Sequence, residues 1–162
     1  MPVVLARVDD RLIHGQIVEG WVPFVGADAI YVVDDEICLD ESRCRLMRMI
    51  LPSGLGLRII STPELCEALS SDRLSRVLIL FNSLNSLVAA IKNGFSMENI
   101  NVGNIHNLRG GHQITPTVFL NKDDITLVKK LHDMGIVLEV RDVPDGRCHD
   151  LFKLVCNEDV HR

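Results

Sequence analysis

Residues 6 to 16 decide the organisation of this chain, and they read Ala6-Arg7-Val8-Asp9-Asp10-Arg11-Leu12-Ile13-His14-Gly15-Gln16. The apolar run Val3 to Leu5 before this stretch predicts a short buried strand. The apolar residues after it follow helical spacing and predict a helix: Ile17, Val18 and Trp21. His14 is therefore expected in a strand-to-helix loop, just ahead of a helix N-terminus, where unpaired backbone N–H groups favour an anion.

The charged residues around His14 suit a phosphohistidine site. Arg7 and Arg11 add positive charge, and the guanidinium of Arg11 can bind two phosphate oxygens at once. Either Asp9 or Asp10 can accept a hydrogen bond from one ring nitrogen, which leaves the other ring nitrogen free to attack. An imidazole among acids and arginines also suits a general base or a metal ligand. A solvated loop histidine beside a surface turn remains the simplest alternative.

Two further segments add to the first one: Tyr31-Val32-Val33-Asp34-Asp35-Glu36 and Asn101-Val102-Gly103-Asn104-Ile105-His106. Together with residues 7 to 16 and Trp21, they resemble the enzyme IIB components of the mannose/fructose/sorbose family of the bacterial phosphotransferase system. The last segment resembles the family's Asn-Val-Gly-Gly-Met-His loop. Asn104 here replaces the second glycine, and Asn107-Leu108-Arg109 also departs from the family pattern. The resemblance extends from Val3 to Asp150.

This resemblance implies a protein-histidine:sugar phosphotransferase that works through a phosphohistidine intermediate. His14 would accept a phosphoryl group from a IIA phosphocarrier domain. It would then pass the group to the 6-hydroxyl of a sugar bound by the membrane components IIC and IID. The residues expected to bind or orient the phosphate are Arg11, Asp10, Arg7, Asp9, Gly15 and Ser83. Ser83 follows a buried strand, so it can instead cap the next helix, or do both.

No cofactor is expected. The chain has no Walker-type Gly-x-x-x-x-Gly-Lys, and Gly54-Leu55-Gly56 lacks the third glycine of a dinucleotide loop. His106 and His112 lie in a predicted loop over residues 104–113, but without nearby cysteines they are a weak signal for a metal. Asp34-Asp35-Glu36 follow a strand, and we expect capping or a surface turn there rather than a cation site.

Length, composition and charge limit the classes of protein. The chain has 162 residues and is expected to form one domain over residues 1–162. Its net charge of −5 argues against nucleic acid as a partner. We expect a cytoplasmic protein that associates with the inner face of the plasma membrane through the permease. Five cysteines without a Cys-x-x-Cys pair, no long apolar stretch and no signal peptide agree with this. A homodimer remains an open alternative.

Apolar runs and helical patterns alternate along the chain, which predicts an α/β fold. The expected architecture is a single, open, mainly parallel twisted sheet with helices on both faces. The resemblance adds about seven strands and one antiparallel edge strand. Later strands are predicted at 29–33, 57–60, 77–81, 101–103, 117–120 and 136–140. Helices are predicted at 40–51, from Thr62 to about Ser71, between Ser83 and Gly94, and from Asn121 to Gly135.

Two other classes of function stay open from the sequence. The chain could be a regulatory module that accepts a phosphoryl group, or only binds a partner, without a role in transport. A histidine-dependent hydrolase is the second alternative, although the Gly-x-Ser-x-Gly nucleophile motif is missing. The three arginines of the helix at 40–51 form either a solvated flank or a docking surface for an acidic partner.

Overall fold

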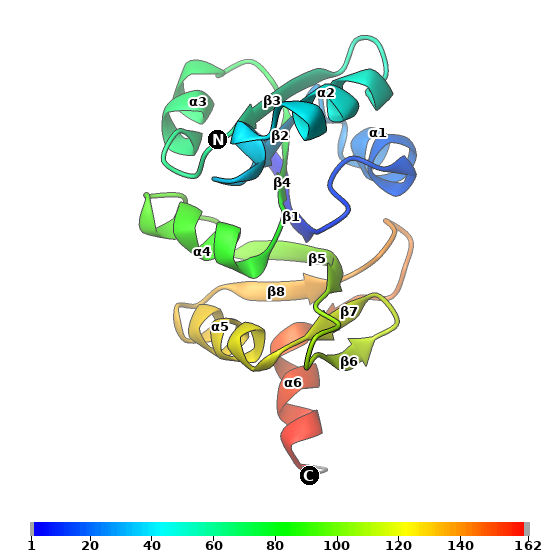
Figure 1. The fold of residues 1–162 in the computed structure, drawn as a ribbon, viewed down its shortest axis with the longest axis vertical. Coiled ribbons are helices and arrows are strands. Elements are labelled where there is room, and N and C mark those ends of the chain that lie inside the picture. The colour runs from blue at the N-terminus through cyan, green and yellow to red at the C-terminus, as the bar shows by residue number, and fades with distance from the viewer. Residues whose placement is uncertain (1, 161–162) are drawn as a thin grey trace.

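Strands and helices alternate along residues 2–160, the part of the chain that the computed structural model describes (Figure 1). The strands are β1 (Val3–Asp9), β2 (Ala29–Val33), β3 (Gly56–Ile60), β4 (Val77–Phe81), β5 (Asn99–His106), β6 (His112–Thr115), β7 (Val118–Leu120), β8 (Val137–Val140) and β9 (His149–Asp150). The helices are the π-helix η1 (Gln16–Trp21), α1 (Val22–Val25), the 3-10 helix η2 (Ile37–Leu39), α2 (Glu41–Ile50), α3 (Leu65–Ser71), α4 (Leu84–Lys92), α5 (Lys122–Asp133) and α6 (Leu151–Val160).

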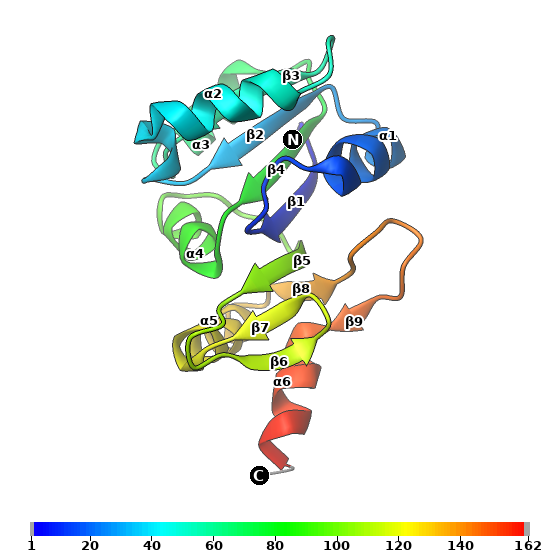
Figure 2. The ribbon, with the colours of Figure 1, turned by 45° about the vertical axis from the view of Figure 1, so that its right-hand side comes forward.

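The sheet has the strand order β3-β2-β4-β1-β5-β7-β6, and β8 joins it through β5 and carries β9. All neighbours are parallel except β6 on β7 and β9 on β8, so the predicted mainly parallel sheet is confirmed. Two edge strands are antiparallel where one was expected. Figures 1 and 2 show a strong twist between the half with β1 to β4 and the half with β5 to β8.

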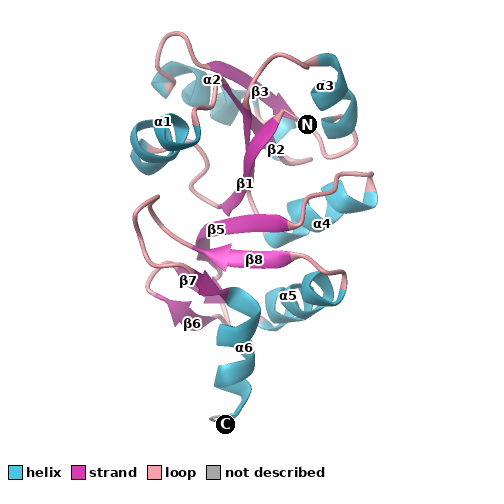
Figure 3. Ribbon diagram, turned by 180° about the vertical axis from the view of Figure 1, so that it is seen from behind, coloured by secondary structure: helices cyan, strands magenta, loops and turns pink. Residues whose placement is uncertain are grey.

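Helices cover both faces of the sheet, as predicted. Alternate residues of β2 point to opposite faces, so Tyr31 and Val32 belong to two separate apolar clusters. One cluster joins the sheet to α3, α4, α5 and α6, and the other joins it to η1, η2 and α2 (Figure 3). Because both faces are buried at β2 and β4, these two strands are continuous apolar runs rather than alternating patterns.

The first strand is longer than its apolar residues predict, because β1 continues through Asp9. Arg7 and Asp9 therefore lie within a strand and not in the loop, which corrects the prediction of a strand at Val3 to Leu5. The strand continues because β4 and β5 pair with it on both sides, as in the pairs Val8 with Phe81 and Val8 with Val102. His14 lies in the loop between β1 and η1, as predicted.

Two further boundaries differ from the predictions. The loop predicted over residues 104–113 is shorter, because β5 continues to His106 and β6 begins at His112. Thr62 does not cap α3: its N–H and hydroxyl both donate to Asp35, and the helix begins only at Leu65. In the tail beyond residue 144, the apolar residues from Leu151 to Val155 left a short terminal helix or packing on a neighbour as alternatives. The structure has β9 and the helix α6 there, and apolar side chains of α6 enter the core.

A bulge in β5 makes room for a buried arginine. Val8 pairs with Val102 but Asp9 pairs with Asn104, so Gly103 is an extra residue on β5. A Cβ added at Gly103 would lie 1.8 Å from Nη2 of Arg7. Only glycine leaves space for the guanidinium at this point.

We predict that Gly103→Ala destabilises the protein by about 3 kcal/mol or more, because a methyl group and a fixed guanidinium would occupy the same space. Urea unfolding followed by circular dichroism measures the change. Gly15→Ala is the matched control: a Cβ there meets nothing within 4 Å, and the backbone is right-handed helical. It should leave the free energy of unfolding unchanged or raise it slightly. Equal stability of the two variants would contradict the prediction.

Candidate functional site

The carboxylate of Asp9 is the centre of the site, at the carboxyl end of β1. Its Oδ2 lies 3.0 Å from Nε2 of His14, 3.1 Å from Nε of Arg7 and 3.0 Å from Nδ2 of Asn104. Its Oδ1 accepts a hydrogen bond of 3.1 Å from the backbone N–H of Arg11. The two oxygens thus hold the histidine, the strand and the loop in one arrangement. The sequence left Asp9 and Asp10 as alternative hydrogen-bond partners of His14, and in the structure the partner is Asp9.

His14 sits in a tight loop with an unusual backbone. Leu12 has φ of 55°, and it is the one non-glycine residue with positive φ among residues 2–160. Burial of the Leu12 side chain and a bond from its N–H to the carbonyl of Asp9 hold this conformation. The His14 side chain is only 8% exposed, and its Nδ1 is buried without a hydrogen-bond partner. Such a buried polar atom calls for an explanation, and ligand binding or catalysis is a common one.

Arg7 is completely buried, so it cannot bind a phosphate directly. Besides Asp9, it donates to Oδ1 of Asn101 and to the carbonyl oxygens of residues 141 and 142. Its guanidinium also lies 5.1 Å from the ring centroid of Trp21, whose Nε1 donates to the carbonyl of Asp142. Arg7 therefore pairs with Asp9 in the structure, whereas the sequence predicted that it binds or orients the phosphate.

The buried ion pair affects the pKa of both partners. Burial lowers the pKa of Arg7, and the charge of Asp9 opposes this effect. Burial alone would raise the pKa of Asp9. The hydrogen bond with His14 and the charge of Arg7 outweigh burial, so the pKa of Asp9 lies below its usual value. Asp9 is therefore ionised at neutral pH, and Nε2 of His14 carries the proton that it donates.

The other residues predicted near His14 occupy the rim of the site. Arg11 is exposed, and so is Gly15, the residue before η1. The backbone N–H groups of Ile17 and Val18 both donate to the carbonyl of His14. These two groups are therefore not available to an anion, and anion binding by the earlier N–H groups of this helix N-terminus stays a prediction.

Asp10 pairs with His106 instead of His14. Its carboxylate accepts from the backbone N–H of His106 at 2.6 Å and lies 3.0 Å from the Nδ1 of the same residue. This contact joins the loop after β1 to the end of β5. The segment from Asn101 to His106 thus contacts the segment from Ala6 to Gln16, although almost a hundred residues separate Asp10 from His106.

Ser83 caps α4, as the sequence suggested: its hydroxyl accepts from the backbone N–H of Ser86 at 3.1 Å. It lines a pocket of about 330 Å³ together with Asp34, Asp35 and Glu36. Carboxylates beside the serine disfavour a phosphate there. Asp34 itself caps the turn after β2, since its Oδ1 accepts from the N–H groups of residues 36 and 37. A phosphate role for Ser83 stays a prediction.

Sequence reasoning missed two asparagines of the site. Asn101 and Asn104 are buried in β5, where they contact Arg7 and Asp9 respectively. A signal was present, because these two amide side chains lie among the apolar residues Ile100, Val102 and Ile105. Buried amides need hydrogen-bond partners, so their position in a central strand already points to a polar network.

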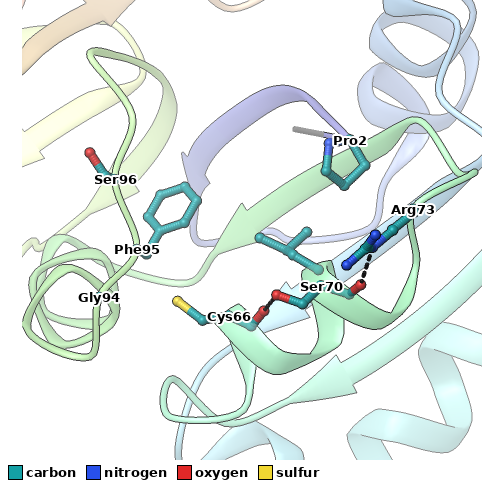
Figure 4. Close-up of a pocket in the computed structure, with 8 residues that line it drawn as sticks. Pro2, Cys66, Ser70, Arg73, Gly94, Phe95 and Ser96 are labelled. Atoms are coloured by element: carbon teal, nitrogen blue, oxygen red, sulfur yellow. Dashed lines mark hydrogen bonds between the residues drawn. The ribbon is translucent and has the colours of Figure 1, made fainter.

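Figure 4 shows a separate pocket of about 560 Å³. Pro2, Arg73 and Phe95 line it, and they precede β1, β4 and β5, so it lies at the amino edge of the sheet. The described residues that line it include none of the site residues predicted from the sequence. Its position at the opposite end of the strands separates it from the His14 site.

Comparison with known proteins agrees with this geometry. The family model described as "PTS system sorbose subfamily IIB component" matches residues 3–162. The fructose-specific EIIB component of Bacillus subtilis is 35% identical over 97% of this chain and 98% of its own length. The N-acetylgalactosamine-specific IIB component 2 of Escherichia coli is 34% identical over 94% of this chain and 98% of its own.

The crystal structure of the IIBSor domain of the sorbose permease from Klebsiella pneumoniae has the same fold. It superposes with a TM-score of 0.90 and 26% identity, and the match covers 97% of this chain and 98% of that one. This chain therefore belongs to the sorbose-subfamily IIB components of the phosphotransferase system. A general phosphotransfer role follows from that membership.

The described residues contain neither a membrane-spanning helix nor a metal-binding cluster. Among residues 2–160, no helix has both the length and the apolar character needed to cross a bilayer. Within the same range, no three side chains of His, Cys, Asp or Glu gather in a group that could hold a metal ion.

We predict that Asp9→Asn lowers the free energy of unfolding by about 3–5 kcal/mol at pH 7, because Arg7 would remain buried without a counter-charge. The pKa of Asp9 is lowered in the folded state. Its stabilisation is therefore complete above the unfolded value of about 4 and disappears as the pH falls through the folded value. Urea unfolding at pH 7 and at about pH 3 should show the wild type and the variant approaching each other in acid. A constant difference across this range would contradict the assignment.

Proposed function

We propose that this protein is a phosphocarrier of sugar uptake in which His14 carries the phosphoryl group. It accepts the group from a phosphorylated IIA domain and passes it to a sugar that the membrane components IIC and IID bind. The observation that carries the proposal is the state of the His14 ring: Nε2 is bound to the ionised Asp9, while the buried Nδ1 has no partner. Family membership supplies the chemistry, and the ring geometry supplies the residue.

The acceptor atom follows from this geometry. Because Nε2 carries the proton that Asp9 accepts, the lone pair of His14 is on Nδ1. This lone pair forms the new N–P bond while the N–P bond of phospho-IIA breaks and its electrons return to the donor imidazole. Nδ1 must become accessible for this step. Movement of the strained loop at Leu12 when IIA docks would expose it.

Charge on the phosphoryl group has to be balanced at the rim of the site. Arg11 is the exposed guanidinium nearest in sequence to His14, and its backbone is fixed by Asp9. We assign it the contact with the phosphoryl oxygens, supported by the backbone N–H of Gly15. Arg7 contributes indirectly, because it binds Asp9 and so keeps this carboxylate in place beside His14.

The partner assignment rests on relatives and stays part of the proposal. The mannose-specific EIIAB component of Escherichia coli is 32% identical over 88% of this chain, and the match covers 45% of that protein. Its name joins a IIA with a IIB part, so a IIA domain is the expected donor here. The relatives are named for fructose, N-acetylgalactosamine and sorbose, so the acceptor is proposed as a sugar hydroxyl without a choice of sugar. This sequence of transfers places the protein on the cytoplasmic side of the membrane.

We predict that the protein gains the mass of one acid-labile phosphoryl group when incubated with phosphoenolpyruvate, enzyme I, HPr and the cognate IIA. His14→Ala should gain none, whereas His132→Ala, which removes the α5 ring that stacks on Phe152 of α6, should behave like the wild type. Intact-protein mass spectrometry at neutral and acid pH measures this. Phosphorus–nitrogen coupling in NMR of labelled protein should place the phosphorus on Nδ1.

Absence of phosphate on the wild type, with phospho-IIA demonstrably present, would reject the phosphocarrier function. Phosphate on Nε2 would reject the acceptor atom alone. Loss of sugar uptake in cells that lack the protein distinguishes transport from the regulatory alternative.

Arg11→Ala should slow phosphoryl transfer from phospho-IIA at least about tenfold, because it removes the exposed positive charge beside His14. Its stability should stay within about 0.5 kcal/mol of the wild type, since the side chain is exposed. Rapid-quench measurement of phosphoprotein formation gives the rate. Arg73→Ala, which removes an exposed arginine before β4 at the opposite edge of the sheet, is the matched control and should leave the rate unchanged. Equal rates for both variants would show that Arg11 does not bind the phosphoryl group.

A further inference from the structure

Three donors converge on one oxygen of the site. Oδ2 of Asp9 is contacted by Nε2 of His14 at 3.0 Å, by Nε of Arg7 at 3.1 Å and by Nδ2 of Asn104 at 3.0 Å. A carboxylate oxygen has two lone pairs, so three donors must share them. The bond from His14 to Asp9 is therefore weaker than it would be in an isolated histidine–aspartate pair.

Of these three donors, Asn104 is the one that neither reacts nor balances the charge of Asp9. The bulge at Gly103 brings Asn104 opposite Asp9 in the pairing of β5 with β1. The residue is 3% exposed, and its amide points into the site between two strands. A neutral amide at this position adjusts the charge on Oδ2 without adding a charge of its own.

We propose that Asn104 is a positioning residue that competes with His14 for Oδ2 of Asp9 and so sets the balance between taking up and releasing the phosphoryl group. This inference rests on the proposed function of His14 and adds to it the control of transfer potential. Asn104 acts through Asp9 and does not touch the phosphoryl group.

The chemistry of transfer gives the direction of the effect. When Nδ1 bonds to phosphorus, the ring becomes more positive and its Nε2–H becomes a stronger donor to Asp9. A stronger bond from Nε2 to Asp9 therefore stabilises phosphorylated His14. On release, the N–P electrons return to Nδ1 while the acceptor oxygen bonds to phosphorus, and the ring is neutral again. By occupying part of Oδ2, the amide of Asn104 weakens the bond that favours the phosphorylated state and thus promotes release.

The test compares the wild type with Asn104→Ala and Asn104→Gly after phosphorylation by phosphoenolpyruvate, enzyme I, HPr and the cognate IIA, which are then removed. Glycine is the residue of the family loop that Asn104 replaces, so this second variant is expected to fold. In both variants phosphorylated His14 should last roughly two- to tenfold longer at neutral pH, the range for one hydrogen bond. The equilibrium with phospho-IIA should shift toward this protein by a similar factor.

A second readout reports on the bond itself. In labelled, unphosphorylated protein, the Nε2–H proton of His14 should move downfield in both variants, because its bond to Asp9 becomes stronger. Asn107→Ala is the matched control: it also removes an amide that donates to a carboxylate, that of Asp124, but one outside the site. It should change neither the lifetime nor the proton shift, whereas a general loss of packing would affect all variants alike.

Each outcome decides the inference. Longer lifetimes together with downfield shifts support it. Unchanged or shorter lifetimes in both Asn104 variants, or a proton that does not move, overturn it while leaving the phosphocarrier function intact. If phospho-IIA does not modify the wild type, the proposed function fails and the inference fails with it.

Discussion

The buried ion pair between Arg7 and Asp9 is the constraint on which the rest of the site depends. An arginine with no exposed surface in the middle of a strand is tolerated only if its charge and its N–H groups find partners. Asp9 supplies the charge, while Asn101 and two carbonyl oxygens after β8 supply the acceptors. The bulge at Gly103 supplies the space. The end of β1, the strand β5 and the segment after β8 are thus fixed around the guanidinium of Arg7.

The same ion pair prepares His14 for chemistry. Asp9 is held in place from the strand side, so its carboxylate presents a fixed acceptor to the ring at the carboxyl edge of the sheet. In open parallel sheets this edge is where ligands bind, because the strands end there together and their loops meet. The loop that carries His14 is held in a strained conformation at Leu12 by the same residue, through the N–H of Arg11 and the carbonyl of Asp9. Asp9 therefore fixes the position and the tautomer of the His14 ring, and it also holds the strained backbone of the loop that carries this ring.

Much of the fold could be predicted from local patterns. Apolar runs bounded by polar residues located the buried strands, and capping side chains such as Asp40, Ser83 and Asn121 located helix starts. The errors occurred where a distant partner overrides a local preference. Thr62 and Pro63 form a good helix start, but Asp35 takes the donors of Thr62. From the sequence pattern alone, the polar end of β1 is predicted as a loop. It is a strand because it pairs with β4 and β5.

The sequence by itself determined the fold class, the loop that presents His14 and the residue types around it, because these depend on neighbours along the chain. Only the tertiary structure decided that Asp9 and not Asp10 holds the ring, that Arg7 is buried, and that Asn104 completes the network. These choices depend on the register between β1 and β5 and on side chains about 95 positions apart. A shift of one residue in that register would turn each side chain to the other face of the sheet. Spacing along the chain carries no information about such a register, which is set by the bulge and by the burial of one arginine.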